Sequence, residues 1–144
     1  MESFLDRSMG YLNHVTALLL KRELLEAIKL NKIDVTPEQW AVLNRLSELN
    51  GLTQKEIAKI TFKDAANVTR IIDKLQEKNM IERKAKPDDR RTWRVHITKE
   101  GQRVRDLIEP LAIEVLKKAT RGVGSDDISR YNEVARKIIN NLER

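Results

Sequence analysis

The sequence predicts a mainly α fold with one small β-hairpin. Only five of the 144 residues are Gly and three are Pro, and aromatic residues make up 4% of the chain, so a β-sandwich with many turns is not expected. Apolar residues recur at intervals of three and four along most of the chain, which is the period of an amphipathic helix. The length is typical of one domain, and we expect residues 1–144 to form it.

Two helices are predicted in the first third of the chain. Residues 3–31 contain no proline and their apolar residues keep helical spacing, so we expect one long helix there. The run Thr36-Pro37-Glu38-Gln39 has the pattern of a capping box with proline at the first helical position, so it starts a second helix. The apolar face of that helix, which ends at Asn50-Gly51, is predicted to contain Trp40, Val42 or Leu43, Leu46 and Leu49.

A pair of short helices follows. Thr53-Gln54-Lys55-Glu56 has the pattern of a capping box and opens the first helix, Thr61-Phe62-Lys63 makes a brief turn, and Asp64 caps the second helix. The second helix is predicted to end at Asn79, a residue type that tolerates the left-handed conformation, and to bury Val68, Ile71, Ile72 and Leu75. Two helices joined in this way indicate a helix-turn-helix, whose second helix can lie in the major groove of DNA.

A basic hairpin is expected next. The helical period is lost after residue 79, so we expect strands at 80–84 and 93–97 with a loop at 87–92. Residues 83–94 hold six basic and two acidic side chains, a net charge of +4, while the whole chain has a formal charge of +6. Such a hairpin after a helix-turn-helix is a wing, whose tip arginine can enter a minor groove. The alternative is a hairpin whose charges only protect a sheet edge.

Two more helices are predicted to complete the chain. Thr98 caps the first, and Pro110 lies within it, so a kink is expected. Gly122-Val123-Gly124 interrupts the helical pattern, and Ser125-Asp126-Asp127 starts the last helix.

The terminal helices carry more apolar surface than one winged helix can cover. We expect the DNA-binding part to be residues 36–98, and the helical dimerisation part to be residues 1–31 and 99–144. Apolar faces that lack a partner within the chain must pair with another molecule, which favours a dimer. A bundle packed on its own winged helix is the alternative.

The exposed side of the second short helix carries groups that suit DNA. Ala65 and Ala66 are small enough to let the backbone approach the groove, and Asn67, Thr69 and Arg70 are of the types that bind base edges. The alternative is an ordinary solvated helix face. With Lys74 on phosphate and Arg90 and Arg91 in the minor groove, the predicted DNA-binding set is Gln54, Lys55, Ala66, Asn67, Thr69, Arg70, Lys74, Arg90 and Arg91.

At this point the sequence resembles a known family. Leu52–Ala58, Asn67–Leu75, Asp89-Arg90-Arg91 and Ile97–Gly101 are similar to segments of the winged-helix regulators of the multiple antibiotic resistance regulator (MarR) family. The resemblance covers nearly the whole chain, and the wing with its Thr-x-x-Gly sequel is its most specific part. Two departures are Asn79, where the family usually has Gly, and Ala66-Asn67, which replaces a common Ser-Thr pair.

The resemblance implies a homodimer that places two recognition helices on a pseudo-palindromic operator. Members of the family usually repress transcription, and many release DNA when a small, often anionic aromatic effector binds. We therefore expect a sequence-specific, ligand-responsive repressor that binds double-stranded DNA. The first alternative is a winged-helix module that binds protein and never DNA. The second is an enzyme, which is disfavoured because the sequence contains no recognisable catalytic motif.

Other sites have weaker signals. Tyr11, His14 and Trp40 are candidates for an effector pocket, although they are also ordinary core and rim residues. His14 and His96 lack the spacing of a metal pair, and the chain has no cysteine, so we expect no metal, cofactor or disulfide. The first residues do not resemble a signal peptide and no apolar stretch is long enough to span a membrane, so a cytoplasmic protein is expected.

Overall fold

A computed structural model describes residues 1 and 3–143, apart from the side chains of Lys86 and Arg90. A 3-10 turn, η1 (Leu5–Arg7), precedes six α-helices and three strands among these residues. The elements, in chain order after η1, are α1 (Met9–Leu30), α2 (Pro37–Glu48), β1 (Leu52–Thr53), α3 (Gln54–Thr61), α4 (Ala65–Glu77), β2 (Ile81–Lys86), β3 (Asp89–Ile97), α5 (Lys99–Ala119) and α6 (Ser125–Leu142).

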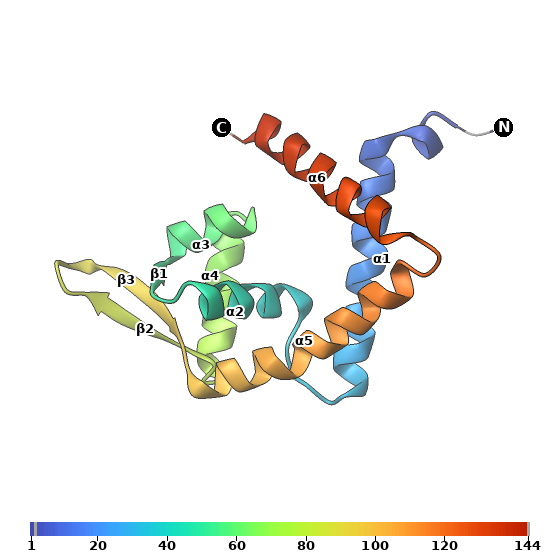
Figure 1. Ribbon diagram of the computed structural model, residues 1–144. Coiled ribbons are helices and arrows are strands. Elements are labelled where there is room, and N and C mark those ends of the chain that lie inside the picture. The colour runs from blue at the N-terminus through green and yellow to red at the C-terminus, as the bar shows by residue number, and fades with distance from the viewer. Residues whose placement is uncertain (2, 144) are drawn as a thin grey trace.

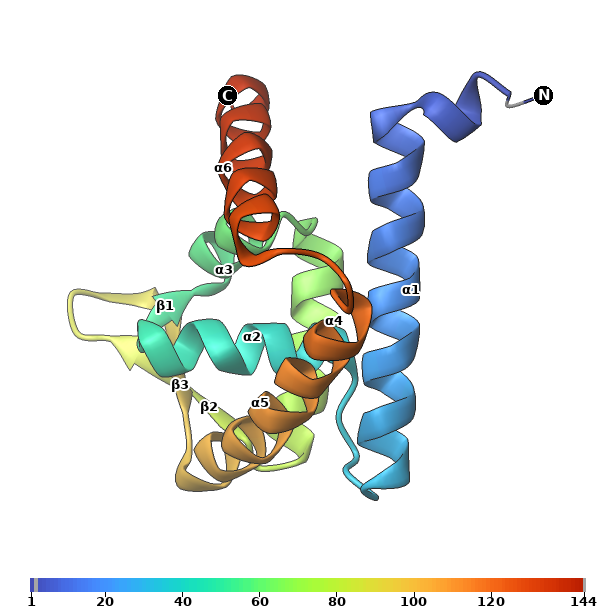
Figure 2. The same ribbon diagram turned by 45° about the vertical axis from the view of Figure 1, so that its right-hand side comes forward.

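The fold is mainly helical with a small three-stranded antiparallel sheet, as predicted for its class. The β2–β3 hairpin projects from one side of the molecule and α1 lies on the opposite side, with α2, α3 and α4 between them (Figures 1 and 2). This arrangement leaves the tip of the hairpin away from the packed helices.

The helix starts follow their capping residues. Thr36 and Gln39 form the predicted capping box: the Gln39 backbone N–H donates to Thr36 Oγ1 at 3.1 Å, and the Thr36 N–H donates to Gln39 Oε1 at 3.2 Å. Asp64 Oδ1 accepts from the Asn67 N–H at 2.7 Å, which places the start of α4 as predicted. Asn79 has the left-handed φ of 59° that ends this helix.

The first helix differs from its prediction. Residues 3–31 do not form one helix, because Ser8 has an extended backbone and its hydroxyl accepts from the Tyr11 N–H at 3.5 Å. This capping separates η1 from α1. An uncharged serine inside an apolar pattern gives little sign of such a boundary, because the leucine spacing continues across it.

The wing also differs from its prediction. The strands are longer than 80–84 and 93–97, and the predicted loop at 87–92 is reduced to a turn, since Lys86 pairs with Asp89 and a bulge follows Ala85. A third strand, β1, was not predicted, because it has only two residues; Leu52 pairs with Val95 of β3.

The core lies between α2, α4, α5 and the sheet. It contains the whole predicted stripe of α4, namely Val68, Ile71, Ile72 and Leu75, together with Leu43 and Leu46 of α2. From α1 only Leu24 and Ile28 are buried, and α6 contributes no buried residue within the described part of the chain. Helix α5 continues through Pro110, and its course bends along its length in Figure 1, in line with the expected kink.

Gly101 locks the base of the wing to α5. A Cβ atom on Gly101 would lie 2.1 Å from the carbonyl oxygen of Met80, so only glycine allows this approach. The same carbonyl accepts from the Thr98 N–H at 3.0 Å, and Thr98 Oγ1 accepts from the Gly101 N–H at 3.0 Å as the predicted cap of α5.

Candidate nucleic-acid interface

The exposed side of α4 carries the polar residues that the sequence predicts for base recognition. Thr69, Arg70 and Lys74 are exposed and Asn67 is half-buried, on the side opposite the buried stripe. Arg70 Nη2 donates to Asn67 Oδ1 at 3.2 Å, so these two side chains lie together one turn apart. Ala65 and Ala66 are exposed at the start of the helix and leave its first turn open to close approach.

The start of α3 meets the middle of α4. Gln54, the first residue of α3, donates from its amide nitrogen to Thr69 Oγ1 at 3.1 Å. Thr69 Oγ1 in turn donates to the backbone oxygen of Ala65 at 3.0 Å. Lys55 is exposed beside Gln54. The structure therefore brings the predicted residues of the two short helices onto one surface.

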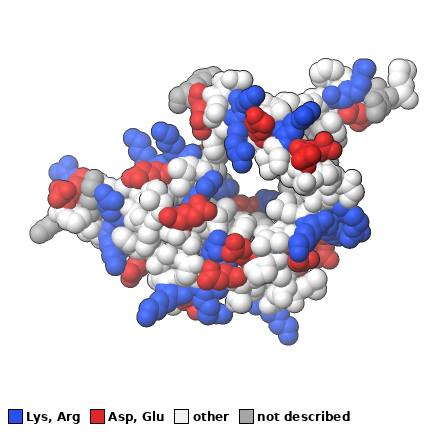
Figure 3. Space-filling view, viewed as in Figure 1, with Lys and Arg blue, Asp and Glu red and all other residues white. Residues whose placement is uncertain are grey.

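The tip of the wing is held by Asp89. Its Oδ1 accepts from the backbone N–H of Arg91 at 2.9 Å, and its Oδ2 accepts from the Thr92 hydroxyl at 2.9 Å. The side chain of Arg91 is exposed, while the side chain of Arg90 lies outside the described residues. Figure 3 shows Lys and Arg side chains along the wing, away from the terminal helices. Arg91 thus stands apart from the α3–α4 surface, as a minor-groove contact beside a major-groove helix requires.

Arg83 and Arg94 are basic residues of the wing whose side chains donate to other parts of the protein. Arg94 Nη1 donates to the backbone oxygen of Gly51 at 3.0 Å. Arg83 joins β2 to α3 and α4 through hydrogen bonds to Gln54, Gln76 and Asp73. We did not predict this role for Arg83 from the sequence. The feature of the sequence that could have indicated this role is the position of Arg83 two residues after Ile81, which is buried. Alternate residues of a strand share a face, so Arg83 lies on the same face as Ile81.

Trp40 lines an apolar cavity between the terminal helices and the winged helix. The cavity has a volume of about 310 Å³ and lies between α1, α2 and α5. The Trp40 indole N–H donates to the backbone oxygen of Arg105 at 3.4 Å. Lys21 lies at the cavity and forms an ion pair with Glu38. Burial raises the pKa of Glu38. The hydrogen bond from Lys21 and its positive charge lower the pKa by more than burial raises it, so the net shift is downward.

The other two predicted effector residues lie elsewhere. Tyr11 and His14 are exposed near the start of α1 and are not among the residues that line this cavity. At 1.5 Å per residue, His14 lies roughly 10 Å along the helix from Lys21. The structure therefore does not bring Tyr11 and His14 together with Trp40.

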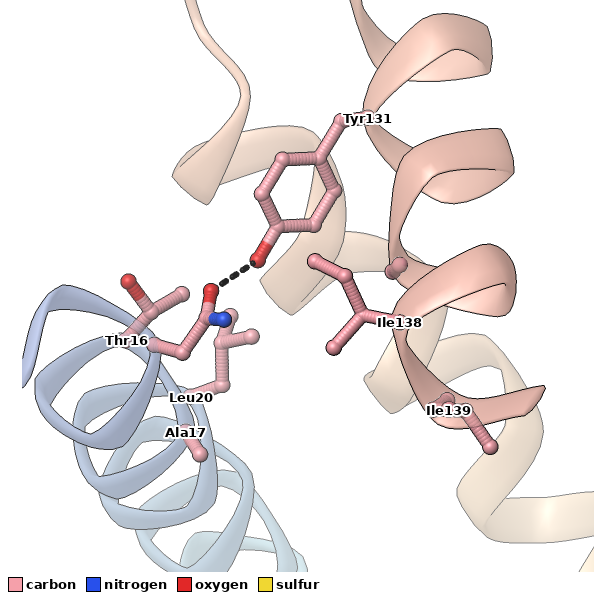
Figure 4. A pocket seen from close by; sticks show the side chains of 8 residues that line it. Thr16, Ala17, Leu20, Tyr131, Ile138 and Ile139 are labelled. Atoms are coloured by element: carbon pink, nitrogen blue, oxygen red, sulfur yellow. Dashed lines mark hydrogen bonds between the residues drawn. The ribbon is translucent and has the colours of Figure 1, made fainter. Parts of the chain in front are cut away.

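A second apolar hollow of about 260 Å³ separates α1 from α6 (Figure 4). Ile138 of α6 and Leu20 of α1 line it, and the Tyr131 hydroxyl spans it and donates to Asn13 Oδ1 at 2.9 Å. Large apolar side chains are also exposed along both helices, namely Leu5, Met9, Leu12, Leu18, Leu19, Tyr131, Val134, Ile139 and Leu142.

The described residues contain no group of three or more His, Cys, Asp or Glu side chains placed to hold a metal ion. None of their helices is long and apolar enough to cross a membrane.

Comparison with known proteins agrees with this geometry. The family model described as "MarR family" matches residues 35–93, which contain the helix-turn-helix and most of the wing. The chain is 27% identical over 135 residues to the uncharacterized HTH-type transcriptional regulator YsmB of Bacillus subtilis (strain 168), a match that covers 92% of this chain and 89% of YsmB.

Solved structures share the fold over nearly the whole chain. The transcriptional repressor CouR bound to a 23-mer DNA duplex aligns with a TM-score of 0.84 and 24% identity, over 94% of both chains. CouR from Rhodococcus jostii RHA1 bound to p-coumaroyl-CoA aligns with a TM-score of 0.82 and 20% identity, over 95% of both chains.

Proposed function

Because this chain is a winged helix-turn-helix transcriptional regulator of the MarR family, we propose that it represses transcription as a homodimer bound to a pseudo-palindromic operator. In this proposal it works in the cytoplasm, on double-stranded DNA. The observation that carries the proposal is the exposed polar side of α4 beside an arginine-tipped wing. One element suits the major groove and the other suits the adjacent minor groove.

The predicted DNA contacts divide into three classes. Asn67, Thr69 and Arg70 meet base edges, Arg91 with Arg90 enters the minor groove, and Lys74 contacts phosphate. Gln54 and Lys55 lie at the start of α3, where backbone N–H groups and the helix dipole favour a phosphate. Ala66 allows the backbone close to the DNA. CouR, which shares the fold, is a repressor that has been captured on a DNA duplex.

The homodimer is supported by the apolar side chains exposed on α1 and α6. These helices contribute little to the core of one subunit, and exposed apolar surface of this extent is typical of an interface. A second copy that packs its own α1 and α6 on these faces would cover them. Two-fold symmetry would then give the assembly two copies of α4, as a palindromic operator requires.

The effector in this proposal is a small anionic aromatic molecule that binds in the cavity beside Trp40. The cavity lies where the terminal helices meet α2, and Lys21 offers a cation at its edge. Tyr11 and His14 stay predictions for this site. Benzoate tests the idea: it should quench the fluorescence of Trp40 in a Trp93→Phe background and weaken DNA binding, and no response in either would contradict it.

The DNA-binding proposal is tested on the DNA upstream of the protein's own coding sequence. Binding is measured over a range of salt concentrations and compared with a random duplex of equal length. We expect the upstream DNA to bind about 10³-fold or more tightly than random DNA, with a strong fall as salt rises. Equal, weak affinity for both duplexes would favour the alternative of a winged helix that binds protein.

A further inference from the structure

A chain of hydrogen bonds runs from the wing into α4, and it starts at Arg83 of β2. The Arg83 side chain is only 21% exposed, and each of its three nitrogen atoms has an acceptor on another element. Nη2 donates to Asp73 Oδ1 and Nη1 to Gln76 Oε1, both at 2.6 Å, while Nε donates to Gln54 Oε1 at 3.1 Å. One side chain of the wing thereby holds both helices of the helix-turn-helix.

The partners of Arg83 separate its role from that of the wing tip. Its charge faces the carboxylate of Asp73, and its donors are directed at protein acceptors. Arg91, by contrast, is exposed at the far end of the same hairpin. A guanidinium that is already paired has little to offer a phosphate, so Arg83 is not expected to add to the salt dependence of DNA binding.

Arginine also determines which way the Gln54 amide points. A guanidinium has only donors, so the Gln54 atom that faces it must be the carbonyl oxygen. The amide nitrogen is thereby directed to Thr69, whose Oγ1 accepts at 3.1 Å. Thr69 donates its one hydroxyl proton to the backbone oxygen of Ala65. The direction of donation is therefore the same in every link, from Arg83 to Ala65.

We infer that Arg83 is a positioning residue that fixes the hydrogen-bonding character of the DNA-reading surface. When this chain of hydrogen bonds is intact, Gln54 offers a hydrogen-bond donor to DNA, and Thr69 offers an acceptor and a methyl group. This inference rests on the proposed DNA-binding function.

The acceptor and the methyl group of Thr69 restrict the base that this side chain can meet. In the major groove adenine and cytosine present an amino donor and thymine presents a methyl group, whereas guanine presents only acceptors. The base that meets Thr69 is therefore adenine, cytosine or thymine, and guanine is disfavoured at that position.

The test is selection from a pool of duplexes with a randomised central segment, followed by measurement of affinity for the selected duplex and for random DNA. Wild-type protein should exclude guanine at one position of each half-site. Arg83→Met should accept guanine there and lose about tenfold or more in its preference for the selected duplex. Its salt slope on random DNA should equal that of the wild type, whereas loss of a phosphate contact would lower the slope by about 0.9.

Gln54→Met provides a second route, because Gln54 is half-buried and its substitution breaks the same chain of hydrogen bonds without removing a charge from the wing. Gln54 is also a proposed phosphate contact, so this variant is judged by its base preference and not by its overall affinity. It should accept guanine at the same position, and the double variant should lose no more preference than the more affected single variant, since both act on one chain. Arg103→Met is the matched control: Arg103 also forms a 2.6 Å ion pair, with Glu100 on α5, and its loss should leave base preference unchanged.

Three results would overturn the inference. They are guanine exclusion that persists in both variants, losses that add in the double variant, and a salt slope that falls in Arg83→Met. A wild-type protein that enriches no sequence at all would instead overturn the proposed function. If Arg83→Met does not fold, Gln54→Met alone decides the matter.

Discussion

Arg83 and Arg91 lie on one hairpin, and their side chains have opposite surroundings. The first is paired with Asp73 and faces the helices, and the second is exposed at the tip. Counting charge along the sequence treats them alike, so the sequence identified the basic hairpin but did not indicate which of its arginines is paired within the protein and which is exposed. Strand alternation carries that information, but only when the strand boundaries are known.

Arg91→Ala should weaken binding to every duplex by a similar factor. An arginine in the minor groove adds sequence-independent affinity and displaces about one counterion, so the salt slope should fall by about 0.9. Fluorescence anisotropy with random DNA at several salt concentrations measures both quantities. An unchanged slope together with unchanged affinity would show that the wing tip does not touch DNA.

Asn67→Ala and Arg70→Ala should instead affect sequence choice. Each should cost roughly 1–3 kcal/mol on the operator and much less on random DNA, because bonds to base edges form only on the right sequence. Since Arg70 donates to Asn67, the two losses should not be additive.

Lys74→Ala serves as the comparison for these two variants. It should weaken binding to both DNAs alike, as a phosphate contact does. If Asn67→Ala and Arg70→Ala behave in the same way as Lys74→Ala, then they too contact only the backbone.

At the scale of the elements, the helices were predicted better than the strands. Local caps define the starts of α2, α4 and α5, and Thr36, Asp64 and Thr98 are recognisable in the sequence. Strand β1 depends instead on the pairing of Leu52 with Val95, more than forty residues later. Contacts so distant along the chain leave no periodic signal in a two-residue strand.

The junction between the wing and α5 gives a test of packing. Gly101→Ala should destabilise the protein by roughly 1–3 kcal/mol, because the new methyl group would lie 2.1 Å from the Met80 carbonyl oxygen and the backbone must move. Gly10→Ala is the control, since its Cβ would have no neighbour closer than 3.7 Å and alanine favours a helix. Urea unfolding at one fixed protein concentration measures both. Equal stability of the two variants would contradict the close approach.

At the scale of the whole molecule, α1 and α6 are the elements whose placement the single chain explains least. Ile138 is half-buried at the hollow beside α1, and Leu142 is 74% exposed at the end of the same stripe. The sequence predicted these apolar faces. It could not predict how they are arranged, because α1 buries only Leu24 and Ile28 and α6 buries none of its described residues, so few core contacts fix their positions.

Ile138→Glu with Leu142→Glu should convert a dimer into monomers, because two charges would have to be buried without partners in the interface. Sedimentation at micromolar concentration gives the mass. Leu49→Glu, at an exposed residue that ends α2, is the control and should stay dimeric. A double variant that remains a dimer would move the interface to the first helix, around Leu12 and Leu19, and a monomeric wild type would contradict the dimer altogether.

The most direct test of the account is a footprint of the wild-type protein on its own upstream DNA. A dimer that places one α4 in each half-site should protect two segments whose centres lie about one helical turn apart, ~34–36 Å, with minor-groove protection beside each from the wing. A single protected segment, or uniform protection that appears only at low salt, would contradict the claim that this protein recognises an operator as a dimer.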